Sequence, residues 1–177
     1  MIRSLVQSLN RLRVDYAITG AIAASYYGAP RTTVDFDIVA YGSLENIRRL
    51  VKALHYARIE AEEETFRRAV RRGAYNIASC KDTMSPHTID VILQRRRFAK
   101  VAGRALGLNT RYQLPEELIR MKLRMIRATR PPERALKDID DIHAILKNTR
   151  VSLRRIKAYA KQDKTLQILD SILEKSG

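Results

Sequence analysis

Two aspartates stand one residue apart in a stretch that otherwise consists of strand-forming residues. The stretch "TVDFDIVAY" places Asp35 and Asp37 among valine, phenylalanine and isoleucine. Because alternate residues of a β-strand point to the same face, the two carboxylates project together, roughly 6–7 Å apart at Cα. Two ionised carboxylates with no cation between them repel each other and are costly to bury. The pattern therefore favours either a water-exposed sheet edge or a bound divalent cation.

A third carboxylate, Asp90, stands in the strand-like run "TIDVIL". If this run lies beside the strand of Asp35 and Asp37, three carboxylates converge. Carboxylate oxygens are ligands that Mg²⁺ prefers, and bound Mg²⁺ keeps positions open for phosphate oxygens. The three aspartates therefore predict a magnesium site for two-metal phosphoryl chemistry.

A candidate phosphate site precedes the aspartates in the segment "ITGAIAA". Gly20 ends a predicted strand, and an alanine-rich helix follows at once. A glycine at this point lets a phosphate approach the backbone, and the first turn of a helix offers unpaired N–H groups.

The elements that must position these residues alternate between strand and helix in the first 110 residues. Periodicity predicts helices at 2–13, 21–30 and 43–56, and strands at 14–20, 33–41, 74–80 and 87–94. The strand–helix–strand start predicts an α+β fold, with a mixed β-sheet that carries helices on one face. We assign residues 1–110 to a catalytic domain and residues 111–177 to a C-terminal helical domain.

The remaining segments are predicted as follows. The charged residues 57–73 are ambiguous and could hold both a short helix and a strand. A basic helix is expected over residues 95–106 and an edge strand over 110–115, after which the apolar periodicity is helical. The predicted C-terminal helices span 115–128, 131–148 and 152–176.

The charge of the chain is strongly basic and unevenly distributed. Thirty-four Lys and Arg face nineteen Asp and Glu, giving +15, and residues 91–177 alone carry 21 basic and 9 acidic side chains, net +12. Such a surplus favours a polyanionic partner such as RNA, although a solubilising surface remains the alternative. We expect the basic faces of the helices after residue 94, with Arg120 and Arg127, to form a track for RNA toward the carboxylates.

Compartment and membrane signals point to the cytoplasm. The single cysteine, Cys80, excludes an internal disulfide framework and suits a reducing environment. The apolar stretches are too short to span a bilayer, and residues 1–14 have the pattern of an amphipathic helix rather than a signal peptide. No membrane partner is expected.

Four separated segments resemble a known family in the same order. They are "TGAIAASYYGAPRTTVDFDIVA", "TIDVIL", "LPEELIRMKLRMI" and "RALKDIDDIHAIL". Across residues 12 to 146 the chain resembles the DNA polymerase beta-like nucleotidyltransferases, and within them the AbiEii-type toxin branch and its uncharacterised prokaryotic relatives. The resemblance implies the nucleotidyltransferase fold.

The resemblance also implies roles for the three aspartates. Asp35 and Asp37 would bind two Mg²⁺ ions and the nucleoside triphosphate. Asp90 would bind the second metal and help to activate an acceptor hydroxyl as a general base. Attack on the α-phosphate would release pyrophosphate.

On the nucleotide side, the resemblance implies a binding role for Gly20, Ala21, Arg31, Thr33, Lys122 and Asp138. Ala21 stands where the family has Gly or Ser, so it keeps the backbone N–H but offers no hydroxyl. Lys122 would reach the phosphates and Asp138 would orient it. Arg31 as a structural turn residue, and Lys122 and Asp138 as solvated helix charges, remain open alternatives.

Three classes of function follow. The leading one is a Mg²⁺-dependent nucleotidyltransferase that moves an NMP from an NTP to RNA, such as a tRNA 3′ end, and that could act as the toxin of a toxin–antitoxin pair with an antitoxin protein as partner. The second is transfer to a protein or small molecule; polycationic aminoglycosides fit a basic chain poorly. The third is a non-catalytic nucleotide- or RNA-binding protein that keeps the fold.

Overall fold

The computed structural model describes residues 1–177 with the exception of residues 31, 34, 72–75, 83–86 and 175–177. The side chains of residues 132 and 134 are also excepted. The chain forms two compact units. The first comprises residues 1–22 and 32–113, and the second comprises residues 23–31 and 114–177.

The first unit is built on a six-stranded mixed sheet with the strand order β3-β4-β2-β1-β6-β5. Strand β2 runs antiparallel to β1 and parallel to β4, and β1 runs parallel to β6. The predicted mixed α+β architecture is confirmed. The strands are β1 (Tyr16–Ile18), β2 (Phe36–Tyr41), β3 (Ile77–Lys81), β4 (Thr88–Gln94), β5 (Lys100–Ala105) and β6 (Leu108–Gln113).

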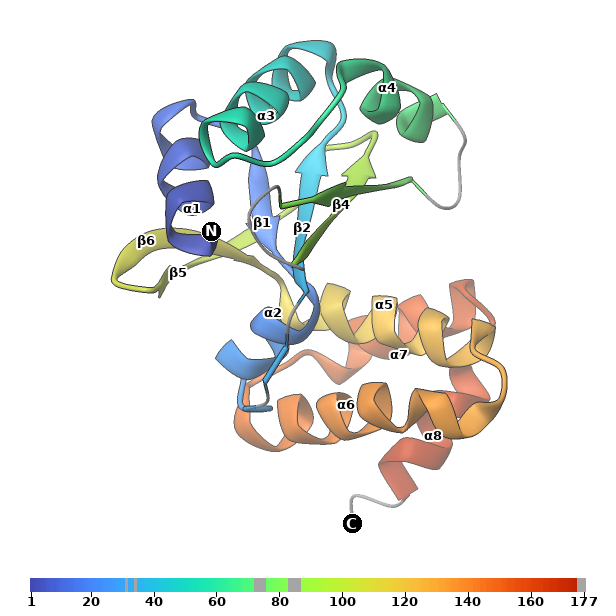
Figure 1. Ribbon diagram of the computed structural model, residues 1–177. Coiled ribbons are helices and arrows are strands. Elements are labelled where there is room, and N and C mark those ends of the chain that lie inside the picture. The colour runs from blue at the N-terminus through green and yellow to red at the C-terminus, as the bar shows by residue number, and fades with distance from the viewer. Residues whose placement is uncertain (31, 34, 72–75, 83–86, 175–177) are drawn as a thin grey trace. The chain divides into compact units, whose positions relative to one another are not determined.

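Three helices cover one face of this sheet: α1 (Ile2–Arg11), α3 (Leu44–Tyr56) and α4 (Glu63–Arg71). They lie side by side over the strands in Figure 1. Alternate strand residues point at them, and Tyr16, Phe36 and Ile38 are fully buried there. Ser43 caps α3 by accepting a hydrogen bond from the backbone N–H of Asn46, as expected of an N-cap serine. The ambiguous residues 57–73 contain the helix α4, with only an isolated bridge from Ile59 to Asp82 in place of a strand.

The prediction of a basic helix over residues 95–106 is wrong, because this segment contributes strand β5 to an antiparallel hairpin with β6. Leu106 and Gly107 form its two-residue turn with φ angles of +50° and +78°. Positive φ at both turn residues is typical of type I′ hairpins. Strand β6 also pairs with β1, so it is an inner strand and not the predicted edge strand.

After residue 113, the described part of the second unit folds into the helices α5 (Pro115–Ala128), α6 (Leu136–Asn148), α7 (Leu153–Gln162) and α8 (Leu166–Glu174), with a short 3₁₀ turn at Pro132–Ala135. The single helix predicted over residues 152–176 is therefore two helices, separated at Asp163–Thr165. The end of α2 (Gly20–Tyr26) belongs with these helices, since Asn148 and Thr149 donate side-chain hydrogen bonds to the carbonyl oxygens of Gly28 and Tyr27. The change of unit at residue 114 leaves all of β6 in the first unit.

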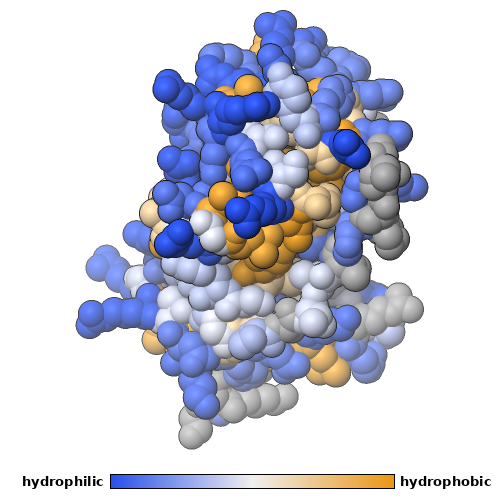
Figure 2. Space-filling model, turned by 60° about the vertical axis from the view of Figure 1, so that its left-hand side comes forward, coloured by the Kyte–Doolittle hydropathy of each residue, from blue (hydrophilic) through white to orange (hydrophobic). Residues whose placement is uncertain are grey.

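Most side chains on the molecular face shown in Figure 2 are hydrophilic, although apolar side chains also gather on it. Among the described helices, none combines the length and the apolar character that a membrane crossing requires.

Candidate active site

The carboxylates of Asp37 and Asp90 lie on neighbouring parallel strands and in register. Strand β2 pairs with β4 so that Asp37 is directly opposite Asp90. In-register residues on adjacent strands are about 4.8 Å apart and point to the same face. Phe36, Ile38 and Ile89 face the helices, so the two aspartates project from the other face, where both are partly exposed. The predicted neighbourhood of these two strands is confirmed.

Asp35 lies one residue before β2 and two residues before Asp37, which pairs with Asp90. Thr88 donates a hydrogen bond of 2.7 Å to its Oδ1, and the hydroxyl of Thr33 accepts a hydrogen bond of 3.2 Å from the Asp35 backbone N–H. The first contact fixes the exposed carboxylate, and the second holds the backbone of Asp35. The Thr33 hydroxyl is thus engaged with the backbone of Asp35.

The carboxylates suit a hard divalent cation by their chemistry. Like charges placed opposite each other on adjacent strands are destabilising unless a cation lies between them. Yet nowhere in the described chain do three His, Cys, Asp or Glu side chains gather closely enough to hold a metal ion together. The structure places two carboxylates side by side and the third near them, and a site shared by all three stays a prediction.

Gly20 lies directly against the Asp37 carboxylate. Its φ of +62° is in the left-handed region, and a Cβ added to it would lie 1.8 Å from Asp37 Oδ2 and 2.9 Å from Asp37 Cβ. The preceding residue ties the two strands together, because the Thr19 backbone N–H donates to the Asp37 carbonyl oxygen at 3.0 Å. Both the backbone conformation and the available space therefore require glycine here. Ala21 is buried, with a relative exposure of 5%.

Lys122 lies within the helical unit rather than in solvent. Its side chain is only 4% exposed, and its Nζ donates to Asp138 Oδ1 at 2.9 Å and to Asp141 Oδ2 at 2.6 Å. The sequence-based pairing of Lys122 with Asp138 is thus present, and the view of Lys122 as a solvated charge is wrong. Asp141 was missed, although its spacing of three residues from Asp138 places both on one helix face. Arg31, the remaining predicted site residue, lies outside the described residues.

Comparison with known proteins gives a clear result for the fold. No protein-family model and no curated protein matches the chain. Two solved structures of ANT(2″)-Ia, one in complex with adenylyl-2″-tobramycin, each superpose with a TM-score of 0.65 at 12% and 11% identity; they cover 93% and 99% of this chain and 95% and 96% of the other. An antigenic nucleotidyltransferase-like protein from Paracoccidioides brasiliensis gives a TM-score of 0.56 at 17% identity, over 96% of this chain and 88% of that one.

The chain has a nucleotidyltransferase fold.

The helical part of this nucleotidyltransferase fold corrects one expectation about the basic residues. Arg120 was expected to face RNA, but its guanidinium donates two hydrogen bonds, of 2.7 and 3.0 Å, to the carboxylate of Asp163 and stacks on Tyr159 at 4.5 Å. Arg127 donates to the Asp163 carbonyl oxygen at 2.5 Å. Hydrogen bonding from Arg120 holds the pKa of Asp163 below its ordinary value. These two arginines therefore fasten α5 to the α7–α8 turn.

Proposed function

We propose that this protein is a Mg²⁺-dependent nucleotidyltransferase that moves an NMP from an NTP to an RNA acceptor. The observation that carries the proposal is the in-register pairing of Asp37 with Asp90 on parallel strands, with Gly20 against the Asp37 carboxylate. A row of like charges on a half-exposed sheet face has no packing benefit, and it suits a cation that bridges to phosphate.

The residues take the following roles in the proposed reaction. Asp35 and Asp37 would hold Mg²⁺ with the triphosphate, and Asp90 accepts the proton of the acceptor hydroxyl as a general base. The acceptor oxygen forms a bond to the α-phosphorus while the bond to the bridging oxygen breaks, and pyrophosphate leaves with that electron pair. Mg²⁺, when bound, neutralises the charge that develops on the phosphate oxygens.

Lys122 has a supporting place in this proposal. Buried between two carboxylates, it is anchored to α6, and the cluster of one cation and two anions leaves a net charge of −1. Asp141 shares with Asp138 the positioning role that the resemblance implied for Asp138 alone. Gly20, Ala21, Arg31 and Thr33 remain the proposed nucleotide contacts on the strand side.

The charge of the chain supports RNA as the acceptor. ANT(2″)-Ia, which shares the fold, is known in complex with an adenylylated aminoglycoside. An aminoglycoside is a polycation, and the net charge of +12 over residues 91–177 would repel it while attracting a polyanion. A tRNA 3′ end, a toxin role of the AbiEii type with an antitoxin partner, and a cytoplasmic location complete the proposal and rest on the sequence alone.

The test is incubation of the protein with Mg²⁺, total RNA and each α-³²P-labelled NTP in turn, followed by gel electrophoresis. Label in RNA supports the proposal, and it should disappear with a chelator and with Asp90→Asn. Asp140→Asn is the matched control, since Asp140 is exposed and makes no side-chain interaction with the other described residues. Label in protein or in a small molecule would move the acceptor to those classes.

Absence of label from every fraction would favour a non-catalytic binding protein. A measurement of NTP binding would then show whether that protein binds nucleotide. NTP–Mg²⁺ should raise the melting temperature by mass action, with a stabilisation of about 2.7 kcal/mol at a hundredfold excess over Kd. The double variant Asp35→Ala and Asp37→Ala should lose this shift and stay folded, because it also loses a like-charge repulsion. Unfolding of this variant without ligand would instead make the aspartates structural.

A further inference from the structure

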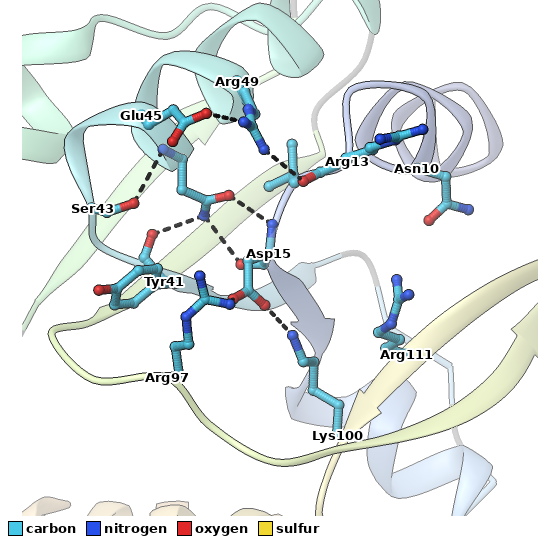
Figure 3. Close-up of a pocket in the computed structure, with 12 residues that line it drawn as sticks. Asn10, Arg13, Asp15, Tyr41, Ser43, Glu45, Arg49, Arg97, Lys100 and Arg111 are labelled. Atoms are coloured by element: carbon cyan, nitrogen blue, oxygen red, sulfur yellow. Dashed lines mark hydrogen bonds and ion pairs between the residues drawn. The ribbon is translucent and has the colours of Figure 1, made fainter.

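A basic recess of about 490 Å³ lies at the end of the sheet opposite to Asp37. It opens where β1 begins and β2 ends, beside the first turn of α3 (Figure 3). Tyr41, which lines it, is four residues along β2 from Asp37, so strand geometry separates the two by about 13 Å. The recess is therefore distinct from the carboxylate pair but lies in the same unit.

Five cationic side chains and two carboxylates line the recess. Lys100 pairs with Asp15, and Arg49 pairs with Glu45. Three guanidinium groups remain in excess, those of Arg13, Arg97 and Arg111.

These three arginines are available to a ligand. Arg97 is 80% exposed and lies 3.6 Å from Asp15, a carboxylate that Lys100 already holds. Arg13 and Arg111 are exposed and form no side-chain hydrogen bond or ion pair within the described part of the chain. Figure 3 shows Arg97, Lys100 and Arg111 pointing into the recess from the β5–β6 side, opposite Arg13. A net surplus of three positive charges in a concave surface focuses a positive potential there.

The frame of the recess is rigid. The side chain of Asn46, 5% exposed, accepts a hydrogen bond of 2.7 Å from the Asp15 backbone N–H and donates to the carbonyl oxygens of Asp15 and Tyr41 at 3.1 and 2.8 Å. One buried amide therefore joins the start of β1, the end of β2 and helix α3. A pre-organised frame lowers the entropic cost of binding.

Part of the positive charge of this recess comes from the segment that follows β4, where the sequence pattern predicted a basic helix. Residues 95–113 contain six basic side chains and no acidic one, which is half of the net +12 of residues 91–177. Folded as the β5–β6 hairpin and its lead-in, they supply Arg97, Lys100 and Arg111 to the recess. In the helical unit, by contrast, Arg120 is paired with Asp163.

We propose that this recess binds the phosphodiester backbone of an RNA, with Arg13, Arg97 and Arg111 as the phosphate contacts. Arginine forks match phosphate oxygens, and Tyr41, with the Arg97 guanidinium 5.3 Å from its ring, offers a face on which a base can stack. The choice of RNA rests on the proposed function, in which the acceptor is RNA. A site about 13 Å from Asp37 would bind the RNA at a point remote from the end that reacts at the carboxylates.

The test measures binding of a fluorescein-labelled single-stranded RNA to the full chain by anisotropy over a range of KCl concentrations. Arg111→Glu and, separately, Arg13→Glu should each weaken RNA binding by about tenfold and lower the salt slope by about one unit for each phosphate that the variant no longer binds. Arg68→Glu on α4 is the charge-matched control, since Arg68 is exposed and does not line the recess. The RNA affinity of the Arg68→Glu variant should stay close to that of the unaltered protein.

The outcomes separate the recess from the proposed chemistry. Loss of RNA affinity in Arg111→Glu and Arg13→Glu, with an unchanged NTP–Mg²⁺ melting shift, supports the assignment. The same loss also supports it if the unaltered protein shows no NTP–Mg²⁺ shift at all, and that result would contradict only the proposed transferase function. Equal effects of Arg111→Glu and Arg68→Glu overturn the assignment. A normal NTP shift with no RNA binding overturns it too and leaves the transferase standing. Polyglutamate that binds as tightly as RNA, with the same sensitivity to Arg111→Glu, would replace RNA by an acidic protein.

Discussion

Replacing Gly20 by alanine tests the contact on which the candidate active site depends. The substitution has two costs. An L-residue at φ +62° costs about 1–2 kcal/mol. The new methyl would lie 1.8 Å from Asp37 Oδ2 and 2.7 Å from its Cγ, so the carboxylate must move, and forced repacking of this kind costs about 1–3 kcal/mol. Gly20→Ala should therefore lower the free energy of unfolding by about 2–5 kcal/mol.

Gly107 provides the matched control for the backbone cost. Its φ is +78°, but a Cβ there would meet no heavy atom of the described residues within 4 Å. Gly107→Ala should cost only the backbone part, about 1–2 kcal/mol. The difference between the two variants, about 1–3 kcal/mol, then measures the clash with Asp37.

The assay is urea unfolding of both variants, repeated in an Asp37→Ala background. Removing the carboxylate deletes the two shortest contacts, at 1.8 and 2.7 Å, and leaves the Asp37 Cβ at 2.9 Å, so the difference between Gly20→Ala and Gly107→Ala should shrink. Gly20→Ala should also lose the NTP–Mg²⁺ melting shift, whereas Gly107→Ala should keep it. If Gly20→Ala costs no more than Gly107→Ala, Asp37 is not held against this backbone and the proposed site geometry is wrong.

Three further outcomes follow from the structure. Lys122→Met leaves two carboxylates without their buried cation and should destabilise the protein by about 3–5 kcal/mol in urea unfolding, whereas Lys157→Met, on an exposed position of α7, should change it by less than about 0.5 kcal/mol. The hydrogen bond from Arg120 lowers the pKa of Asp163, so the Asp163 carboxylate stabilises the fold above its unfolded pKa of about 3.9, and this stabilisation is lost as the pH falls through the lower folded pKa. Asp163→Asn should therefore flatten the curve of unfolding free energy against pH below about pH 4. An unchanged curve would contradict the pairing of Arg120 with Asp163. Burial raises the pKa of the Cys80 thiol to about 11, so alkylation by iodoacetamide at pH 8 should be much slower in the folded protein than in urea.

Local pattern predicted those parts of the fold whose sequence matches their final environment. The alternation of buried and half-exposed residues in β4 and the apolar period of α3 are readable because each element buries one face against the core. The hairpin β5–β6 was not readable, since Lys100–Ala105 is rich in residues that suit a helix, and its turn is Leu-Gly rather than Asn-Gly. Its strand state depends on β6 pairing with β1, about ninety residues earlier in the chain, and no local propensity reports such a contact.

The sequence by itself determined the chemistry of this protein: Asp35, Asp37 and Asp90 in strand-like runs, a glycine at the turn before them and a large basic surplus. Residue type and the spacing of apolar residues suffice to predict this chemistry. Both are local properties of the chain that do not depend on where the residues lie in the fold. Only the tertiary structure decided the pairing, namely Asp37 opposite Asp90, Lys122 buried between two carboxylates and Arg120 held by Asp163. It also decided which cations remain available, because Arg13 and Arg111 line the same recess only when β6 pairs with β1. Partner choice is a property of distance and burial, and both arise only from the packed chain.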